Sequence, residues 1–226
     1  MATILITGVG RGIGLELCRQ AIADGHAVIG SVRDSGQAER LGATLGGQLT
    51  ILEFDVTDAA ALSAAARSLD QPIDILINNA GIIGPKRQST LDMDFEGFAE
   101  TLAINTLAPL RVAQAFLPHL ERAERPRLLT ISSRMGSMSY AKSDQIAYRA
   151  SKAAVNKIVQ ALATDLAPRG IAVASIHPGW VRTDMGGSSA DIAPEDSASG
   201  ILALAEKLTL AETGRFWNYD GSELAW

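Results

Sequence analysis

The sequence predicts an α/β protein with one domain over residues 1–226, built on a doubly wound parallel sheet of about seven strands with helices on both faces. Short apolar runs alternate with helical patterns along the whole chain, without a linker or repeat. The apolar runs lack strict polar–apolar alternation, as expected of strands that helices cover on both faces. A glycine-rich turn joins the first apolar run to the first helical pattern, where such sheets often bind ligands.

The expected strands are short apolar runs: Thr3–Thr7, Ala27–Val32, Leu49–Phe54, Ile73–Ile77, Arg127–Ser132, Ile171–Ile176 and Arg215–Tyr219. The expected helices have apolar residues at helical spacing: Gly12–Ala23, Ala59–Leu69, Phe95–Leu120, Tyr148–Leu166 and Pro194–Leu208. Sheets of this class bind ligands beyond the carboxyl ends of their strands, so motifs at those ends carry most of the functional information.

Composition and net charge bear on which classes of protein the chain can belong to. With 47% apolar and 20% charged residues, the chain can bury a large core without disulfides or a structural metal. The net charge of −5 gives no basic footprint for nucleic acid. The single cysteine, Cys18, lies in an apolar helical stretch, which favours a buried structural thiol. The sequence has no signal-peptide pattern and no apolar stretch of about 18 residues, so we expect a cytoplasmic protein without a membrane partner.

The first expected strand runs into a glycine-rich turn, Thr7-Gly8-Val9-Gly10-Arg11-Gly12-Ile13-Gly14, that opens the first helix. Glycines at 8, 12 and 14 allow a sharp turn and a close approach of the backbone to a pyrophosphate, while the helix N-terminus offers N–H groups to the anion. A plain tight turn is the alternative. The placement between a strand and a helix favours a dinucleotide cofactor.

The end of the second expected strand favours NADP(H) over NAD(H). An acidic side chain there would bind the ribose 2′-hydroxyl and repel a 2′-phosphate, but Val32 and Arg33 occupy this stretch. Arg11, in the glycine-rich turn, is a second cation at the same end of the sheet. Guanidinium groups match phosphate oxygens in a fork geometry. The alternative is that both arginines are solvent-exposed, with Asp34 neutralising Arg33.

A tyrosine and a lysine form the candidate reactive pair. Tyr148 and Lys152 are four residues apart on an expected helix, so they share one face. A free tyrosine, with a pKa near 10, is a poor acid–base catalyst at neutral pH. A nearby ammonium, helped by the positive charge of an oxidised nicotinamide, would stabilise the phenolate and lower that pKa. Tyr148 could then donate a proton to a carbonyl oxygen as hydride reaches its carbon. Ser132 and Ser133, at the end of a strand, could orient the same oxygen; ordinary helix surface is the alternative for the pair.

Together these motifs resemble the short-chain dehydrogenase/reductase superfamily. The resemblance rests on segments in the family's order: Thr7–Gly14, Asn78-Asn79-Ala80-Gly81, Ser133, Tyr148–Lys152, and Pro178-Gly179 followed by Val181 and Thr183. It covers nearly the whole chain and implies a Rossmann-type fold, a nicotinamide cofactor and a Ser–Tyr–Lys mechanism with a supporting asparagine. The spacing from Ser133 to Tyr148 is longer than is usual in the family, which leaves Ser132 as an alternative to Ser133.

Carried over position by position, the resemblance implies that Ser133 orients the substrate oxygen, Tyr148 is the acid–base and Lys152 binds the nicotinamide ribose. The implied catalytic set is Asn105, Ser133, Tyr148 and Lys152. The residues expected to contact the cofactor are Gly8, Arg11, Gly12, Ile13, Gly14, Arg33, Asp55, Val56, Asn79, Ala80, Gly81, Tyr148, Lys152, Pro178, Gly179, Val181 and Thr183. We expect no metal.

Asn105 matches the family's helix asparagine, whose backbone carbonyl is thought to hold a proton-relay water. Pro109 lies four residues later and has no N–H to donate to that carbonyl. If the segment is helical, the carbonyl is left free to accept a hydrogen bond from water. A simple kink is the alternative.

The Ser132–Ser137 stretch and the ending Phe216–Gly221 are similar to the sniffer-like and C-factor-like carbonyl reductase branch. That branch implies NADPH-dependent reduction of a carbonyl compound. We expect a hydrophobic substrate in a pocket formed by Arg134–Gln145, the segment after Asn79, and Trp180–Pro194, with Gly186–Pro194 as a mobile lid or a plain loop.

Two other classes of function stay open. One is an NADP(H)-binding signalling or regulatory protein, and the other is a redox-neutral epimerase or dehydratase on the same scaffold. The long apolar helices Phe95–Leu120 and Tyr148–Leu166 usually form an interface in the family, so the resemblance implies a homodimer or homotetramer.

Overall fold

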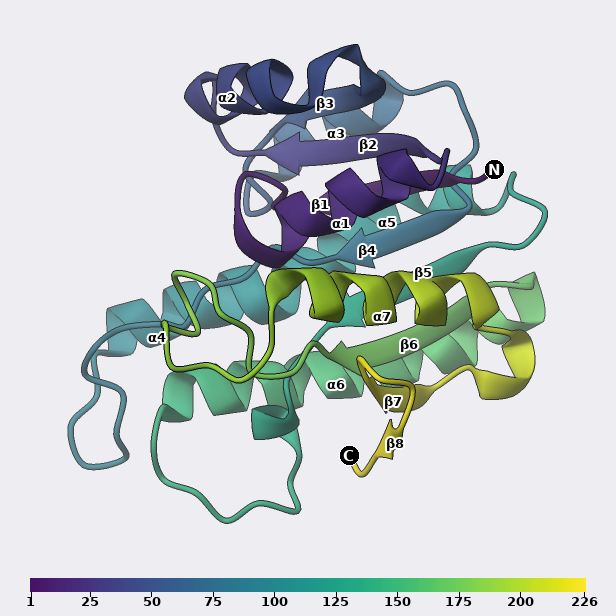
Figure 1. Cartoon of the computed structure of the whole chain (residues 1–226). Helices are drawn as coiled ribbons and strands as arrows, with labels where there is room; N and C mark the ends of the chain where they lie inside the picture. Colours follow the sequence, from purple (N-terminus) through teal and green to yellow (C-terminus); the bar gives the residue numbers. More distant parts are fainter.

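The computed structural model describes residues 1–226, except for the burial of Gly46. Its centre is one eight-stranded sheet in the order β3-β2-β1-β4-β5-β6-β7-β8 (Figure 1). The strands are β1 (Thr3–Thr7), β2 (Ala27–Val32), β3 (Leu49–Glu53), β4 (Ile75–Asn78), β5 (Arg127–Ile131), β6 (Ala172–His177), β7 (Arg215–Asn218) and β8 (Glu223–Leu224). All neighbouring strands are parallel except β7 and β8.

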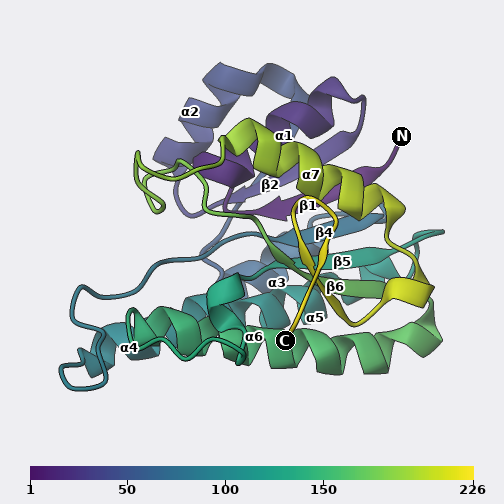
Figure 2. The same cartoon turned by 60° about the horizontal axis from the view of Figure 1, so that its bottom comes forward.

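Helices cover both faces of the sheet (Figures 1 and 2). One face carries α1 (Gly12–Ala23), α2 (Ser35–Leu45) and α7 (Pro194–Lys207). The other carries α3 (Ala59–Arg67), α5 (Ala108–Leu120) and α6 (Ile146–Leu166), and α4 (Phe95–Leu102) packs beside α6. The shorter helical turns are η1 (Gly46–Gln48), η2 (Ala103–Leu107), η3 (Arg134–Gly136), η4 (Ala167–Arg169) and η5 (Leu210–Glu212).

Successive residues of each central strand pack into different layers. Ile4 and Ile6 of β1 belong to the core under α1 and α7, whereas Leu5 belongs to the core under α5 and α6. All three side chains are at most 1% exposed. Because side chains alternate across a strand, a strand buried on both sides must be apolar at every position. This explains the continuous apolar runs of the sequence.

The predicted doubly wound parallel sheet is confirmed. The bounds expected for β1, α1 and β2 are those observed, and the other expected elements differ by one or two residues at their ends. The sheet has eight strands rather than about seven, because the chain turns back after β7 and adds the two-residue antiparallel β8. Helix α2 was not predicted: Leu41 is its one buried side chain among the described residues, so its apolar pattern is weak.

The expected helix Phe95–Leu120 is interrupted. Residues Ala103–Leu107 form a π-helical turn, η2, between α4 and α5, and the Ala108 N–H donates to the Ala103 oxygen five residues back. When a single π turn interrupts an α-helix, it frequently lies at a functional site. The turn precedes Pro109, whose missing N–H removes one bond from the α-helical ladder.

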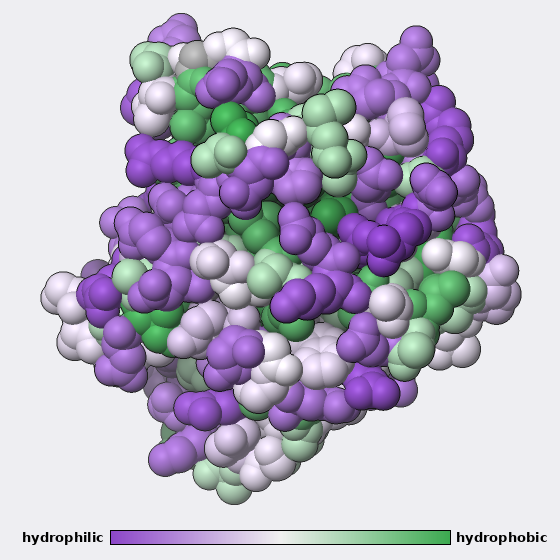
Figure 3. Space-filling view, turned by 45° about the vertical axis from the view of Figure 1, so that its right-hand side comes forward, coloured by the Kyte–Doolittle hydropathy of each residue, from purple (hydrophilic) through white to green (hydrophobic). Residues whose placement is uncertain are grey.

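The surface and the thiol agree with a protein that buries its apolar residues in the core. On the face shown in Figure 3, hydrophilic residues surround small apolar patches. No helix among the described residues is long and apolar enough to cross a membrane.

Cys18 is fully buried, and burial raises the pKa of its thiol to about 12, which confirms the predicted buried thiol.

Candidate active site

The expected site residues converge at the carboxyl ends of the central strands. Here β1 turns into α1, β4 ends before Asn79, and β5 ends before Ser132. The strand order reverses at β1, with β2 on one side and β4 on the other. Doubly wound sheets bind ligands at this kind of switch point, because the loops leave the two neighbouring strands in opposite directions.

The turn between β1 and α1 needs glycine for physical reasons. Gly8 has φ +71°, and a Cβ there would lie 2.9 Å from the Cα of Ala80. A Cβ on Gly14 would collide with the Gly8 carbonyl oxygen and would lie 2.5 Å from Nδ2 of Asn79. The turn is therefore packed tightly from inside, and its outer side exposes bare backbone.

Asn79 and Thr7 brace this turn from below. The Asn79 side-chain Nδ2 donates to the backbone oxygens of Thr7 and Gly8, at 2.9 and 3.1 Å. In return, the Thr7 hydroxyl accepts from the backbone N–H groups of Asn79 and Ala80, at 3.0 and 3.1 Å. The side chain of Asn79 thus acts within the protein, where it fixes the glycine turn. The role of Thr7 was missed at the sequence level.

The N-terminus of α1 has no side-chain cap. Arg11 occupies the N-cap position with extended backbone, φ −167° and ψ 176°, and makes no side-chain capping bond. The first N–H groups of a helix have no intrahelical acceptor, and they carry the positive end of the helix dipole. Because the glycine turn lies beside them, these N–H groups can donate hydrogen bonds to the oxygens of a pyrophosphate.

The two arginines at this end of the sheet differ in their contacts. Arg33 is exposed after β2, and none of the ion pairs within 4 Å in the described chain joins it to an acid. The Asp34 carboxylate instead accepts from Gln37, both from its backbone N–H at 2.9 Å and from its side chain at 2.7 Å. Arg11 donates to Asp184 at 2.9 Å, with both side chains 74% exposed. Such an exposed pair is worth at most about 1 kcal/mol, so a phosphate can replace it.

Asp55 and Val56 follow the neighbouring strand β3. The Asp55 carboxylate accepts from the hydroxyl and the backbone N–H of Thr57, at 2.6 and 2.7 Å. The hydrogen bond from the Thr57 hydroxyl is the main reason why the pKa of Asp55 lies below its usual value. Val56 is buried in the core. The pair forms a fixed corner beyond the end of β2, because Phe54 N–H donates to the oxygen of Val32.

Ser133, not Ser132, is directed to Tyr148. Ser132 is 1% exposed and its hydroxyl is directed to the backbone oxygen of Lys152, at 3.4 Å. The Ser133 hydroxyl accepts from the Met135 N–H at 3.1 Å, and it acts on Tyr148 by hydrogen bonding, which lowers the pKa of the phenol. The longer spacing between Ser133 and Tyr148 is taken up by the loop before α6.

Lys152 lies one helical turn after Tyr148. Its Nζ is 5.7 Å from the centre of the Tyr148 ring and donates to the Ile131 backbone oxygen at 2.8 Å. Burial lowers the pKa of Lys152 to about 8 and raises that of Tyr148 to about 12. In each case burial disfavours the charged form of the group. That the ammonium and the positive charge of an oxidised nicotinamide together lower the pKa of Tyr148 stays a prediction.

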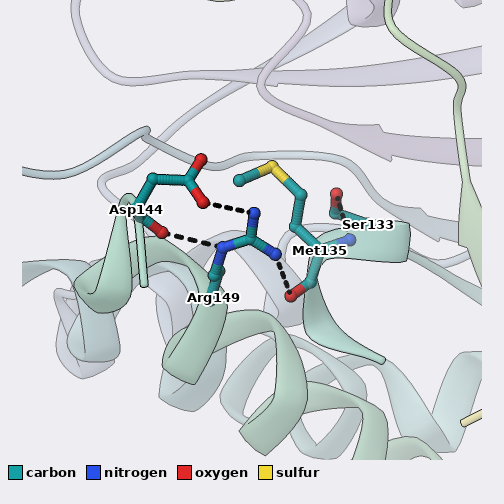
Figure 4. Close-up of polar contacts among 4 residues, drawn as sticks. All are labelled: Ser133, Met135, Asp144 and Arg149. Carbon is teal, nitrogen blue, oxygen red and sulfur yellow. Dashed lines mark hydrogen bonds and ion pairs between the residues drawn. The ribbon is translucent and has the colours of Figure 1, made fainter. Parts of the chain in front are cut away.

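The loop between Ser133 and α6 is held by Arg149, a residue that the sequence did not single out. Figure 4 shows the Arg149 guanidinium between the two ends of this loop. It donates to the Asp144 carboxylate at 2.8 Å, to the Asp144 backbone oxygen at 2.7 Å and to the Met135 backbone oxygen at 3.4 Å. The hydrogen bond from Arg149 is the main cause of the lowered pKa of Asp144. These contacts fix the loop to the first turns of α6.

Asn105 lies in the π turn and faces the same site. Its Nδ2 donates to the Ile82 oxygen at 2.8 Å and to the Ser151 hydroxyl at 3.0 Å, while its Oδ1 accepts from the Ile82 N–H at 2.9 Å. The side chain therefore joins the segment after Gly81 to α6. That the backbone oxygen of Asn105 accepts from a relay water stays a prediction, which rests on the N–H that Pro109 lacks.

The Pro178–Thr183 segment closes the site from the β6 side. Thr183 lies beside the glycine turn, because a Cβ on Gly12 would be 3.3 Å from its Cγ2. Val181 is buried and forms a bridge with Ile192. The Arg182 guanidinium donates to the backbone oxygens of Ala190 and Asp191, at 3.0 and 2.9 Å. The expected lid is thus tied at its base in this conformation.

His177 lies at the end of β6. Burial lowers its pKa to about 4, and the charge of Arg134 acts in the same direction. The imidazole is therefore neutral at physiological pH.

A cavity of about 440 Å³ opens next to the start of α6. It is lined by Ile83, Gly84, Pro85, Lys86, Arg87, Gln88, Ser89, Asp92 and Gln145. Two of the segments expected to form the substrate pocket, the one after Asn79 and the loop that ends at Gln145, therefore meet in space. The loops expected to form the substrate pocket also carry exposed apolar side chains: Met138 (83% exposed), Tyr140 (48%), Trp180 (50%) and Met185 (45%).

Comparison with known proteins identifies the family. The profile of the short chain dehydrogenase family matches residues 2–192. C-signal from Myxococcus xanthus is 44% identical over 157 residues, which are 69% of this chain and 93% of that protein. The carbonyl reductase Sniffer of D. melanogaster has a TM-score of 0.93 and 35% identity over 100% of both chains. The NADPH-bound carbonyl reductase from chicken fatty liver has a TM-score of 0.92 and 32% identity, over 100% of this chain and 99% of that one.

These matches agree with the site that the strand ends assemble, and they confirm the predicted resemblance to the sniffer-like and C-factor-like branch. The chain belongs to the short chain dehydrogenase family of oxidoreductases.

Proposed function

We propose that this chain is an NADP(H)-dependent carbonyl reductase that acts as one domain over residues 1–226. The observation that carries the proposal is the juxtaposition of Ser133, Tyr148 and Lys152 at the same strand ends as the glycine turn. Tyr148 is the general acid, Ser133 orients the carbonyl oxygen and Lys152 holds the nicotinamide ribose.

The residues present fit a dinucleotide. A Cβ at Gly8 or Gly14 would collide with Ala80, or with the Gly8 oxygen and Asn79, so these glycines keep the turn between strand and helix tight, as dinucleotide-binding turns require. The N-terminus of α1 has no side-chain cap, so its N–H groups are available to the phosphates. When bound, NADPH supplies the hydride. Arg33 and Arg11 would hold a 2′-phosphate, and the NADPH in the chicken relative supports this preference.

The proton for the carbonyl oxygen comes from Tyr148. Burial raises the pKa of its phenol to about 12, so the phenol carries a proton at neutral pH. The phenolate that forms in the transition state is stabilised by the ammonium of Lys152, 5.7 Å from the ring. Asn105 offers its backbone oxygen to the water through which Lys152 and Tyr148 regain protons.

The proposed substrate is a hydrophobic ketone or aldehyde. Exposed apolar side chains from two segments, Met138 and Tyr140 on one and Trp180 and Met185 on the other, flank the site. Exposed apolar groups that gather around a site commonly mark a binding surface.

We also infer a homodimer or homotetramer through α4 and α5. Phe95 at the start of α4 is 76% exposed, and Leu107 just before α5 is 45% exposed. A second copy of the chain could cover these side chains. Light scattering of Phe95→Asp together with Leu107→Asp should give a smaller mass than the parent protein.

A signalling role is the second candidate, and the 44% identity to C-signal is the observation that favours it. The intact Ser133, Tyr148 and Lys152 favour an active enzyme in either case, since a pure sensor needs no acid–base tyrosine.

The experiment is NADPH oxidation by the purified protein with a panel of aldehydes, ketones and quinones. Tyr148→Phe should abolish turnover while NADPH still binds, because only the phenolic hydroxyl is removed. Tyr219→Phe is the matched control: it keeps the ring that lies beside Gly179, removes only the hydroxyl, and should keep its activity. Tight NADPH binding without turnover of any carbonyl would contradict the reductase and favour the signalling role.

A further inference from the structure

The helix that carries Tyr148 has no local cap. Gln145 stands at the N-cap of α6 with left-handed backbone, φ 50° and ψ 48°, and its side chain makes no capping bond. Gln145 is also the one non-glycine residue with positive φ in the described chain. The first N–H groups of a helix need acceptors from elsewhere. Tyr148 is the third residue of α6, so its own N–H is one of these groups.

Gln88 supplies the missing acceptors from a distant part of the sequence. The Ile146 N–H donates to the Gln88 backbone oxygen at 2.8 Å. The Tyr148 N–H donates to the Gln88 side-chain Oε1 at 3.1 Å, across 60 residues of sequence. Gln88 therefore caps the first turn of α6 with both its backbone and its side chain, as an N-cap residue ordinarily does from the adjoining position.

The capping amide is itself fixed. Gln88 is 8% exposed, and its Nε2 donates to the backbone oxygens of Ile83 and Pro85, at 3.1 and 2.8 Å. Because both N–H bonds of the amide are directed to carbonyls, the oxygen must point to the helix. The segment that accepts these bonds is held in turn by Asn105 through Ile82.

Lys152 does not share this support. It lies in the next turn of α6, and its Nζ is held by the Ile131 oxygen on β5. The separation of the Tyr148 ring from the ammonium therefore depends on two independent anchors. Fraying of the first turn would move Tyr148 and leave Lys152 in place.

We propose that Gln88 is a positioning residue for Tyr148: it caps the turn of α6 that presents the phenol to the substrate carbonyl. The catalytic consequence rests on the proposed carbonyl reductase function, whereas the capping itself does not. Gln88 acts through the backbone of Tyr148 and contacts neither of the reacting groups.

The test compares Gln88→Met, Gln88→Glu and Gln71→Met. Methionine keeps the length of the side chain and removes every polar atom, while the Gln88 backbone oxygen still accepts from Ile146. Glutamate restores an acceptor for the Tyr148 N–H but has no donor for the Ile83 and Pro85 oxygens. Gln71→Met is the matched control, because it makes the same change at an exposed glutamine before β4, away from the carboxyl ends of the strands. Amide hydrogen exchange at Tyr148, kcat for the best carbonyl, and the Kd for NADPH are measured for each.

We expect the Tyr148 amide of Gln88→Met to exchange about tenfold faster, as for the loss of an ordinary cap. Its kcat should fall about five- to tenfold with the NADPH Kd unchanged. Gln88→Glu should recover only part of both effects, because it restores the acceptor but not the donors to Ile83 and Pro85. Unchanged exchange in Gln88→Met, or an equal loss of kcat in Gln71→Met, would overturn the proposal. If the parent protein reduces no carbonyl, the proposed function fails, and the exchange measurement alone still decides whether Gln88 caps the helix.

Discussion

The ammonium nitrogen of Lys152 lies 2.8 Å from the backbone oxygen of Ile131, to which it donates a hydrogen bond across the interface between α6 and β5. The same nitrogen would be 3.7 Å from a Cβ on Gly81, in the turn after β4. A buried lysine thus stands between the cofactor side of the site and the Tyr148 ring. Burial disfavours the charged form of Lys152 and lowers its pKa from 10.5 to about 8.

This cost predicts how stability depends on pH. The folded-state pKa of Lys152, about 8, lies below its ordinary value of 10.5, so the folded protein binds fewer protons than the unfolded chain between these values. The free energy of unfolding should therefore rise as pH increases from about 8. The raised pKa values of Cys18 and Tyr148 act in the opposite direction above their ordinary values of 9.0 and 10, and they do so equally in the parent protein and in Lys152→Met. Urea unfolding of the parent protein and Lys152→Met from pH 7 to 9.5 should show the rise in the parent alone; parallel curves would contradict it.

The packing of the glycine turn predicts the effect of Gly14→Ala. The new Cβ would collide with the Gly8 oxygen and press on the Asn79 amide, both of which belong to the turn itself. We expect a loss of about 1–3 kcal/mol in the free energy of unfolding and little NADPH binding. In Gly42→Ala, the new methyl group meets no atom within 4 Å, so this substitution in α2 should stabilise the protein by about 0.5–1 kcal/mol. Equal destabilisation by both would show that the close contact is not the cause.

The arginines predict the cofactor preference. Arg11→Ala combined with Arg33→Ala should raise the Kd for NADPH about tenfold or more, which corresponds to at least about 1.4 kcal/mol, while the Kd for NADH changes little. The physical reason is that only NADPH has the 2′-phosphate that a guanidinium can bind. Arg40→Ala, on the exposed side of α2, is the control. A similar loss of affinity for both cofactors would rule out recognition of the 2′-phosphate.

The two neighbouring serines predict different outcomes. Ser133→Ala should lower kcat about a hundredfold or more, because it removes the hydroxyl that orients the substrate oxygen. Ser132→Ala should leave most of kcat and instead cost about 1 kcal/mol of stability, since its buried hydroxyl is directed to the Lys152 backbone oxygen. Steady-state kinetics and thermal unfolding of both variants separate the roles. The opposite ranking of kcat would make Ser132 the orienting residue.

Much of the fold follows from local sequence signals. Continuous apolar runs predicted the central strands, since a strand with two covered faces cannot alternate. The glycine turn predicted the position of the cofactor site, because its residues are adjacent in sequence and the need for glycine there is steric. The apolar helical stretch around Cys18 likewise predicted that its thiol lies in the core.

The parts that could not be predicted depend on tertiary contacts. Helix α2 buries one side chain, so it has little apolar periodicity to detect. Gln88 and Arg149 look like ordinary polar residues in the sequence, and their roles arise only when distant segments meet. The effect of burial on the pKa of Tyr148 also needs the complete fold, because spacing reveals the neighbour but not the depth.

The brace between Asn79 and Thr7 spans 72 residues of sequence, and it has a consequence for folding. Contacts so distant in the chain form slowly, because a long loop must close before they contribute any stability. The glycine turn therefore reaches its final shape only after β4 has inserted beside β1, although β1, α1 and β2 could already associate. During refolding, helical structure should thus recover before the capacity to enhance NADPH fluorescence, which reports a late event of assembly.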